Sequence, residues 1–243
     1  MKNTKSYAAF ESLFDEFIDE LGGQRLDKLY PEVTTAGIKN ADYYLQSTKT
    51  IVELKTLVSD HGDRQSILSI VSHAAKELKL PQTVVSNWQA GKAPLPRSIR
   101  RIVDRKVQNS LKNVARKANE QLRKTERFIG SAKNKILVVA NLQETLFGPA
   151  ELLKYLAGHM LERKNPSTDA IILLTPGVAY SSFGAEPEHY CIPVYADGKT
   201  HLGEVAEPMI KAWIEFEAKS LGVAAEIEIT DELDRKTLSA RPV

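Results

Sequence analysis

Residues 40–57 of the chain read NADYYLQSTKTIVELKTL. Two apolar segments flank the polar residues 47–50, and this pattern predicts a β-hairpin. Three charged residues, Asp42, Glu53 and Lys55, interrupt the apolar pattern of the two strands. Buried charges cost several kcal/mol unless they are paired or hold a metal, so the hairpin needs a compensating partner. A divalent cation that faces a phosphate group would compensate this cost.

The parity of the hairpin predicts that the three charged side chains lie together. If Gln46 pairs with Ile51, then Lys55 lies opposite Asp42. Side chains alternate between the two faces of a strand, so a connection of even length puts Asp42, Glu53 and Lys55 on one face of the sheet. A connection of odd length would separate them. The grouping is therefore a structural prediction.

Around the hairpin, the chain alternates helices with short apolar strands. Apolar residues spaced three and four apart predict a first helix from Tyr7 to Leu21. The sequence from Arg64 to Phe128 is mostly helical, with breaks at Pro81 and at 91–96. Further strands are expected at 135–141, 170–175, 190–196 and 225–229, and further helices at 148–163 and 207–221.

This order of elements predicts an α/β fold with a mixed central sheet flanked by helices and with a helical insertion. We expect residues 1–62 to form the first half of the core, with a helix and the hairpin. Residues 63–111 form the insertion, a subdomain that could contact DNA, and 112–243 complete the core.

Charge is distributed unevenly along the chain, although its net charge is only +2. Between Lys92 and Lys135 there are fourteen Lys and Arg residues against three Asp and Glu residues. A basic block of this density indicates a polyanionic partner, whereas the alternative is a solvated helical face. The candidate nucleic-acid contacts are Arg97, Arg100, Arg101, Arg105, Lys106, Arg116, Lys117 and Lys124.

The hairpin also carries the groups that metal-assisted phosphodiester hydrolysis requires. Asp42 and Glu53 would supply carboxylate ligands to Mg²⁺, and the carbonyl of Leu54 is a further candidate ligand. The metal would activate a bound water and neutralise charge on the phosphate. Lys55 would place a cation beside that phosphate or orient the water.

The order of these residues resembles the PD-(D/E)xK nuclease superfamily, which has the restriction-endonuclease-like fold. The resemblance rests on Asp42 and on the sequence Glu53-Leu54-Lys55 within an apolar strand. It implies that Asp42 and Glu53 bind Mg²⁺, with Mn²⁺ as a substitute, and that Lys55 assists the chemistry. Ala41 stands where the superfamily has proline.

Two helices extend the resemblance, which covers about residues 7–58 and 112–141. Many members carry a Gln or Lys on a helix after the Glu-x-Lys strand, and Gln121, with Lys124 behind it, matches that position. Members often carry an acid on the first helix as well. The candidates are Glu20 and Glu16, which border the apolar stripe of that helix.

Residues 75–92 are similar to the helix-turn-helix of Cro-type repressors. Lys79 and Pro81 stand where that motif usually has Gly and Ser or Thr. The alternative is a small helical subdomain with Trp88 in its core. Carried over from the motif, the residues that face a major groove would be Gln82, Thr83, Ser86 and Asn87.

Together these patterns predict a Mg²⁺-dependent DNA endonuclease of restriction or phage-defence type. Two alternatives are a non-catalytic DNA-binding or regulatory protein with the same fold, and an RNA-directed nuclease. A homodimer is expected if two sites cut two strands. The single cysteine, Cys191, and the short apolar runs favour a cytoplasmic protein without a membrane segment.

Overall fold

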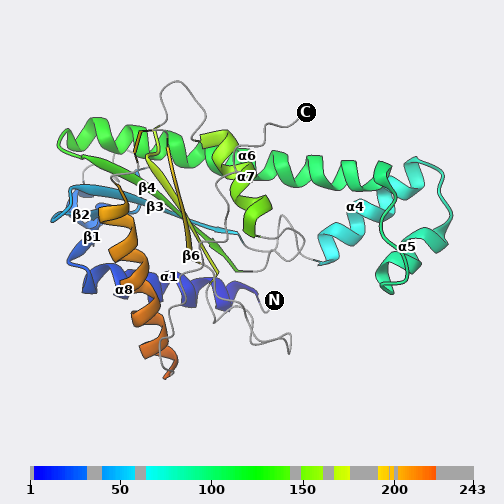
Figure 1. Cartoon of the computed structure of the whole chain (residues 1–243), viewed down its shortest axis with the longest axis horizontal. Coiled ribbons are helices and arrows are strands. Elements are labelled where there is room, and N and C mark those ends of the chain that lie inside the picture. The colour runs from blue at the N-terminus through cyan, green and yellow to red at the C-terminus, as the bar shows by residue number, and fades with distance from the viewer. Residues whose placement is uncertain are drawn as a thin grey trace.

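The computed structural model describes residues 3–31, 40–57, 64–142, 149–160, 167–175, 191–196, 198–199 and 202–222. The strands form one six-stranded sheet in the order β1-β2-β3-β4-β5-β6 (Figure 1). They are β1 (Gly23–Arg25), β2 (Tyr43–Leu45), β3 (Thr50–Leu57), β4 (Asn134–Asn141), β5 (Ala170–Leu174) and β6 (Cys191–Tyr195). The helices are α1 (Asn3–Glu20), α2 (Leu26–Leu29), α4 (Arg64–Glu77), α5 (Gln82–Gln89), α6 (Arg97–Ile129), α7 (Pro149–Met160) and α8 (Gly203–Leu221).

The sheet is mixed, as the sequence predicts. The strand pairs β1–β2, β2–β3 and β5–β6 are antiparallel, whereas β3–β4 and β4–β5 are parallel. All of β5 and nearly all of β4 are buried. Their continuous apolar sequences are typical of parallel strands covered on both faces of the sheet.

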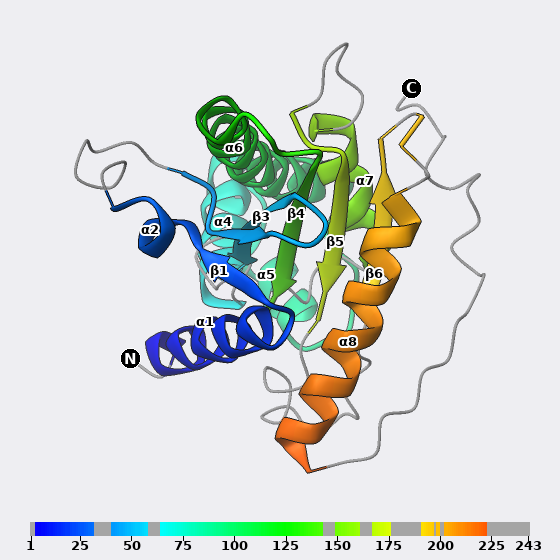
Figure 2. The same cartoon turned by 90° about the vertical axis from the view of Figure 1, so that its left-hand side faces the viewer.

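Helices cover both faces of the sheet, which gives three layers (Figure 2). On one face, α1 and α8 pack against the strands through aromatic side chains, and the rings of Phe17 and Trp213 lie 5.1 Å apart. On the other face, α6 and α7 pack against β4 and β5. Leu137 belongs to the second core and Val138 to the first, as the alternation of side chains along a strand requires.

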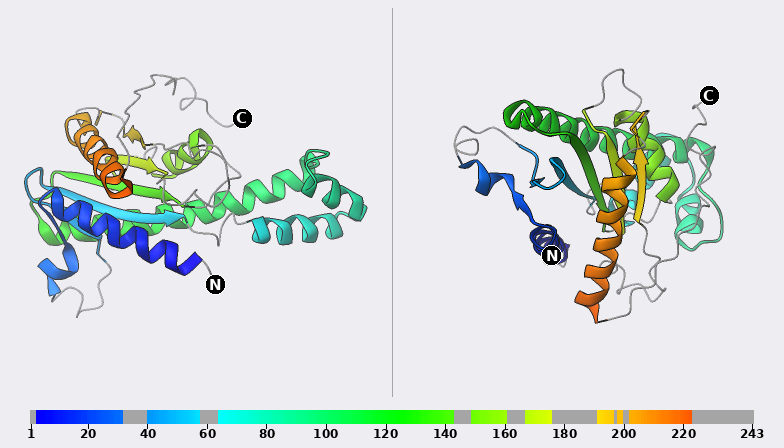
Figure 3. Two further views of the ribbon diagram at one scale, coloured as in Figure 1. Left: turned by 90° about the horizontal axis from the view of Figure 1, so that it is seen from below. Right: turned by 60° about the vertical axis from the view of Figure 1, so that its left-hand side comes forward.

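The predicted helical insertion projects beyond the sheet as an arm (Figures 1 and 3). This helical arm consists of α4, α5 and residues 97–111 of α6. Val85, Ile99 and Val103 are buried in its core, and Trp88 packs against them. No Pro or Gly occurs between Pro96 and Gly130, so nothing stops α6. The boundary expected at 111/112 therefore falls inside one helix.

Some elements differ from the sequence expectations. Helix α8 begins at Gly203, four residues earlier than expected, so Pro208 lies inside the helix and not at its start. Strand β1 was not predicted because it has only three residues and pairs with a distant partner. A side chain at Gly23 would put its Cβ 2.5 Å from Leu45, so glycine permits this pairing. The strand expected at 225–229 lies outside the described residues.

Candidate active site

The β2–β3 hairpin has a different register from the expected one. Tyr43 pairs with Val52, so continuing the ladder by one residue puts Asp42 opposite Glu53 and not opposite Lys55. The expected register is wrong by two residues because Gln46 belongs to the turn and not to the strand.

A shift of two residues preserves the side-chain parity of a strand. Asp42, Glu53 and Lys55 therefore still lie on one face, and this part of the prediction is confirmed. It is the face that α6 covers, since Ile51 packs against Leu122 in the same cluster.

A cleft opens where β2 and β3 diverge. It has a volume of about 340 Å³ and is lined by Glu11, Arg25, Asp42, Tyr43, Leu54, Lys55 and Thr56. The backbone N–H of Leu54 donates to Oδ2 of Asp42 at 2.8 Å. In an antiparallel strand the N–H and C=O of one residue point to the same neighbour. The carbonyl of Leu54 therefore faces the cleft as well.

Glu53 is a buried carboxyl group whose negative charge has few compensating partners. It is 0% exposed, and neither of its oxygens accepts a hydrogen bond of good geometry, although Oε1 forms an ion pair with Nζ of Lys55. Burial raises its pKa to about 8, and the charge of Asp42 adds to this effect while Lys55 opposes it.

Asp42 shares this environment. Burial raises its pKa, against the opposing effects of Lys55 and of the Leu54 N–H. A half-buried and a fully buried carboxyl group thus share one lysine. When both are ionised, this side of the cleft lacks positive charge, and a divalent cation would supply it.

Helix α6 holds the segment that precedes Asp42. Nε2 of Gln121 donates to the carbonyl of Asn40 at 2.8 Å, and the N–H of Ala41 donates to Oγ1 of Thr125 at 2.8 Å. Gln121 therefore lies beside the cleft segment, as its helix was expected to do. Lys124, by contrast, pairs with an acid of its own helix on the surface.

The first helix brings a different acid to the cleft from the ones expected. Glu20 forms a surface ion pair with Lys219 at 3.4 Å and does not line the cleft, and Glu16 is exposed. Glu11 lines the cleft instead, and its charge contributes to the raised pKa of Asp42. The apolar stripe of α1 is flanked by acids on both sides. Glu16 and Glu20 lie on one side, whereas Glu11 and Asp15 lie on the other side, which faces β1 and the cleft.

Arg25 is a cleft residue that the sequence did not single out, because it lies on the unpredicted strand β1. Its guanidinium group pairs with Asp15 at 3.0 Å and with Asp27 at 3.1 Å. The hydroxyl of Tyr43 donates to the same Asp15 at 2.7 Å. Arg25 also opposes the rise in the pKa of Asp42, so it places positive charge at the mouth of the cleft.

The candidate nucleic-acid contacts all lie on α6 and are exposed, but none of them lines the cleft. Those in the helical arm are Arg97, Arg100, Arg101, Arg105 and Lys106, and those above the sheet are Arg116, Lys117 and Lys124. These basic side chains on the surface of α6 therefore lie apart from Asp42 and Glu53 of the cleft.

The motif-like segment of the arm has the geometry of two helices joined by a short turn. Lys79 has φ 53°, in the left-handed region that favours the glycine of the repressor motif. Trp88 faces inward, which also fits a plain helical subdomain. The exposed face of α5 carries Gln82, Thr83, Ser86 and Asn87.

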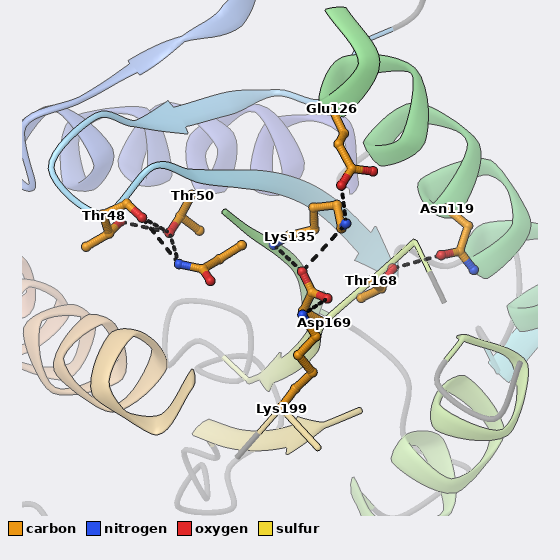
Figure 4. Close-up of polar contacts among 9 residues, drawn as sticks. Thr48, Thr50, Asn119, Glu126, Lys135, Thr168, Asp169 and Lys199 are labelled. Atoms are coloured by element: carbon orange, nitrogen blue, oxygen red, sulfur yellow. Dashed lines mark hydrogen bonds and ion pairs between the residues drawn. The ribbon is translucent and has the colours of Figure 1, made fainter. Parts of the chain in front are cut away.

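A polar cluster fixes α6 to the far end of the sheet (Figure 4). Asp169 is almost fully buried, accepts the N–H of Lys135 at 2.9 Å and pairs with Lys199 at 3.3 Å. Lys135 also pairs with Glu126 of α6 at 2.5 Å. These contacts set the position of α6, and thereby of Gln121, relative to the strands.

Comparisons of the chain with protein-family models, curated proteins and solved structures found no match. Among the described helices, none has both the length and the apolar character needed to cross a membrane. Within the same residues, no three His, Cys, Asp or Glu side chains gather as a metal site. The candidate ligands for a cation are therefore two carboxylates and a backbone carbonyl.

Proposed function

We propose that the protein is a nuclease that hydrolyses phosphodiester bonds of DNA with the help of Mg²⁺. The observation that carries this proposal is the carboxyl pair Asp42 and Glu53 on adjacent chain segments: the half-buried Asp42 lines an open cleft, and the buried Glu53 lies directly behind it. The resemblance to the PD-(D/E)xK superfamily supports the same reading.

The donor set fits a hard divalent cation. Mg²⁺ prefers carboxylate and carbonyl oxygens, and here these would come from Asp42, Glu53 and Leu54. Oε1 of Glu53 is engaged by the ammonium group of Lys55, whereas Oε2 has no hydrogen-bond partner of good geometry, so Oε2 keeps its capacity to bind a metal. When bound, Mg²⁺ or Mn²⁺ would activate water and neutralise phosphate charge.

Lys55 has a second role in this proposal. Its ammonium group now neutralises part of the charge of Glu53. Once that charge is compensated otherwise, Lys55 is free to contact a phosphate oxygen or to orient the attacking water. Gln121 acts as a positioning residue, because its amide holds the carbonyl two residues before Asp42.

Glu11 and Arg25 complete the cleft. Glu11 brings a third carboxylate to the lining, next to Asp42. Arg25 presents a guanidinium group that is held by two aspartates. A fixed guanidinium suits recognition of a phosphate, so we assign Arg25 to a phosphate next to the one that is cleaved.

DNA is the proposed substrate because the exposed side of α6 is strongly basic. Action as a homodimer, and a role in restriction or phage defence, belong to the same proposal. A cytoplasmic location does so too.

A cleavage assay tests the proposal. Supercoiled plasmid, linear duplex, single-stranded DNA and RNA are incubated with Mg²⁺ or Mn²⁺, and the wild type is compared with Glu53→Ala and Lys55→Ala. We expect metal-dependent cutting of DNA that falls at least about 100-fold in both variants, since each removes electrostatic support of the transition state.

Glu16→Ala and Lys28→Ala are matched controls, because they remove an exposed acid and an exposed base outside the cleft. Both should cut like the wild type. Binding without cutting in either metal would favour the non-catalytic alternative, and cutting confined to RNA would favour the RNA-directed one.

A further inference from the structure

The outer face of α6 carries a continuous stripe of positive charge. Seven Lys and Arg residues follow one another at intervals of four, four, seven, four, seven and four residues. Residues at such intervals lie on one side of a helix. We call this set the basic stripe, and it consists of Arg97, Arg101, Arg105, Lys112, Arg116, Arg123 and Arg127.

All seven stripe side chains are exposed. Within the described part of the chain, none of them forms an ion pair. The acids of α6 are engaged elsewhere or set aside: Glu120 pairs with Lys124, Glu126 pairs with Lys135, and Asp104 is half-buried. Glu120 also interacts electrostatically with Arg116 and Arg123, but seven cations against three acids leave most of the positive charge of the stripe without compensation from its own helix.

The basic stripe faces away from the cleft. Gln121 and Thr125 point to the hairpin, where they bond to residues 40 and 41. Arg123 follows Gln121 by two residues, which is about 200° around a helix of about 3.6 residues per turn. The stripe thus lies on the opposite side of α6, a helix that itself lies at the margin of the molecule in Figure 2.

The stripe is long and winds gradually around the helix, by about 120° from its first residue to its last. Thirty residues separate Arg97 from Arg127, which is about 45 Å at a rise of about 1.5 Å per residue. Helix α6, which carries the stripe, runs from the helical arm to its end beside the sheet (Figure 1). A duplex offers about one phosphate charge per 1.7 Å of its axis, so a duplex of this length presents more than enough phosphates for each of the seven cations to contact one.

From these observations we propose that the basic stripe binds the backbone of double-stranded DNA outside the cleft, as a second contact surface for a long substrate. The inference deepens the proposed function, whose assignment of DNA draws on the same basic helix, and it does not rest on cleavage. A membrane fits less well, because a membrane-surface helix needs an exposed apolar face. The apolar face of α6 is buried against the sheet and the arm.

The test is a binding assay in EDTA with a labelled 30-base-pair duplex at several salt concentrations. One variant combines Arg97→Gln, Arg101→Gln and Arg105→Gln, and a second combines Arg116→Gln, Arg123→Gln and Arg127→Gln. Each should lower the slope of log affinity against log salt by about 2.7, at about 0.9 per phosphate contact, and weaken binding at least about tenfold at 100 mM salt.

A third variant, with Lys28→Gln, Lys154→Gln and Lys211→Gln, removes the same charge from exposed sites outside the stripe and should change affinity less than about twofold. Circular dichroism and urea unfolding verify that all variants are folded. Equal losses in stripe and control variants, no loss in a folded stripe variant, or stripe-dependent binding only to phosphatidylserine vesicles or RNA would overturn the proposal. Glu53→Ala tests cutting, and the stripe substitutions should weaken binding in EDTA as much in the Glu53→Ala background as in the wild type, so the two proposals fail separately.

Discussion

Glu53 shows how a single side chain ties stability to activity. The protein interior offers it the ammonium group of one lysine and, as the smallest effect, the backbone N–H of Asp42. A group in such a place favours its neutral form, yet the proposed reaction needs it ionised. The cost of keeping this carboxyl group is therefore a loss of stability in the metal-free protein.

Proton linkage turns this cost into a prediction for the metal-free protein. The pKa of Glu53 is raised from the usual 4.5 to about 8, so the folded state holds its proton more tightly than the unfolded state. The stabilisation is complete below pH 4.5 and is lost as the pH rises through about 8.

Glu53→Gln, which cannot ionise, should keep its stability over this range. In EDTA, the free energy of unfolding of the wild type should fall relative to the variant by up to about 1.4 kcal/mol per pH unit between these limits. Urea unfolding at pH 5 to 9 measures it, with Glu16→Gln as the control for loss of a surface carboxyl group. Parallel curves for wild type and Glu53→Gln would contradict the raised pKa.

Thr125 offers a second prediction at this scale. Its hydroxyl is the acceptor for the buried N–H of Ala41. Thr125→Val keeps the shape but leaves that donor unpaired, and it should lower the free energy of unfolding by about 1–3 kcal/mol. Thr125→Ser keeps the hydroxyl and should recover most of this loss in urea unfolding. A valine variant as stable as the wild type would show that the hydrogen bond contributes nothing.

At the scale of elements, the sequence predicted those features that depend on residues close together in the chain. The parity of the hairpin follows from alternation along two strands, and the chain satisfies it. The register depends on whether Gln46 joins the turn, and composition does not decide that. Glu11, and not Glu20, lines the cleft because of the position of α1 along its own axis. The packing of α1 against α8 and β1 determines that position. Those partners are distant in sequence, and β1 was too short to predict.

The turn between α4 and α5 allows a test of local strain. Lys79 has φ 53°, a conformation that costs a residue with a Cβ about 1–2 kcal/mol. Lys79→Gly should therefore raise the free energy of unfolding by about 1 kcal/mol. Lys79→Ala removes the same charge but keeps the Cβ, so urea unfolding should show no comparable gain. Equal effects of both variants would attribute any change to the charge alone.

For the molecule as a whole, one question is whether the helical arm and the sheet unfold together. Their apolar side chains form one continuous cluster that joins Val85 and Ile99 of the arm to Leu137 of β4. The same helix, α6, runs through both parts. A shared core and a shared helix favour a single cooperative transition.

The two tryptophans of the chain report on the two parts separately, because Trp88 lies in the arm and Trp213 packs on α1. Single-tryptophan variants, Trp88→Phe and Trp213→Phe, should each unfold with one fluorescence transition. In each variant, the midpoint of the fluorescence transition should coincide with the midpoint measured by circular dichroism. An arm signal that melts at lower urea concentration than the backbone signal would show that the arm is an independent unit.

The unbroken course of α6 also fixes an angular phase between the arm and the cleft. Inserting one residue near position 109 would turn the arm by about 100° and move it by about 1.5 Å relative to Gln121. Inserting seven residues would nearly restore the angle, because two turns of a helix take about 7.2 residues. Insertions of about seven or about eleven residues would therefore keep the angle between the arm and the cleft, whereas insertions of one or two residues would not.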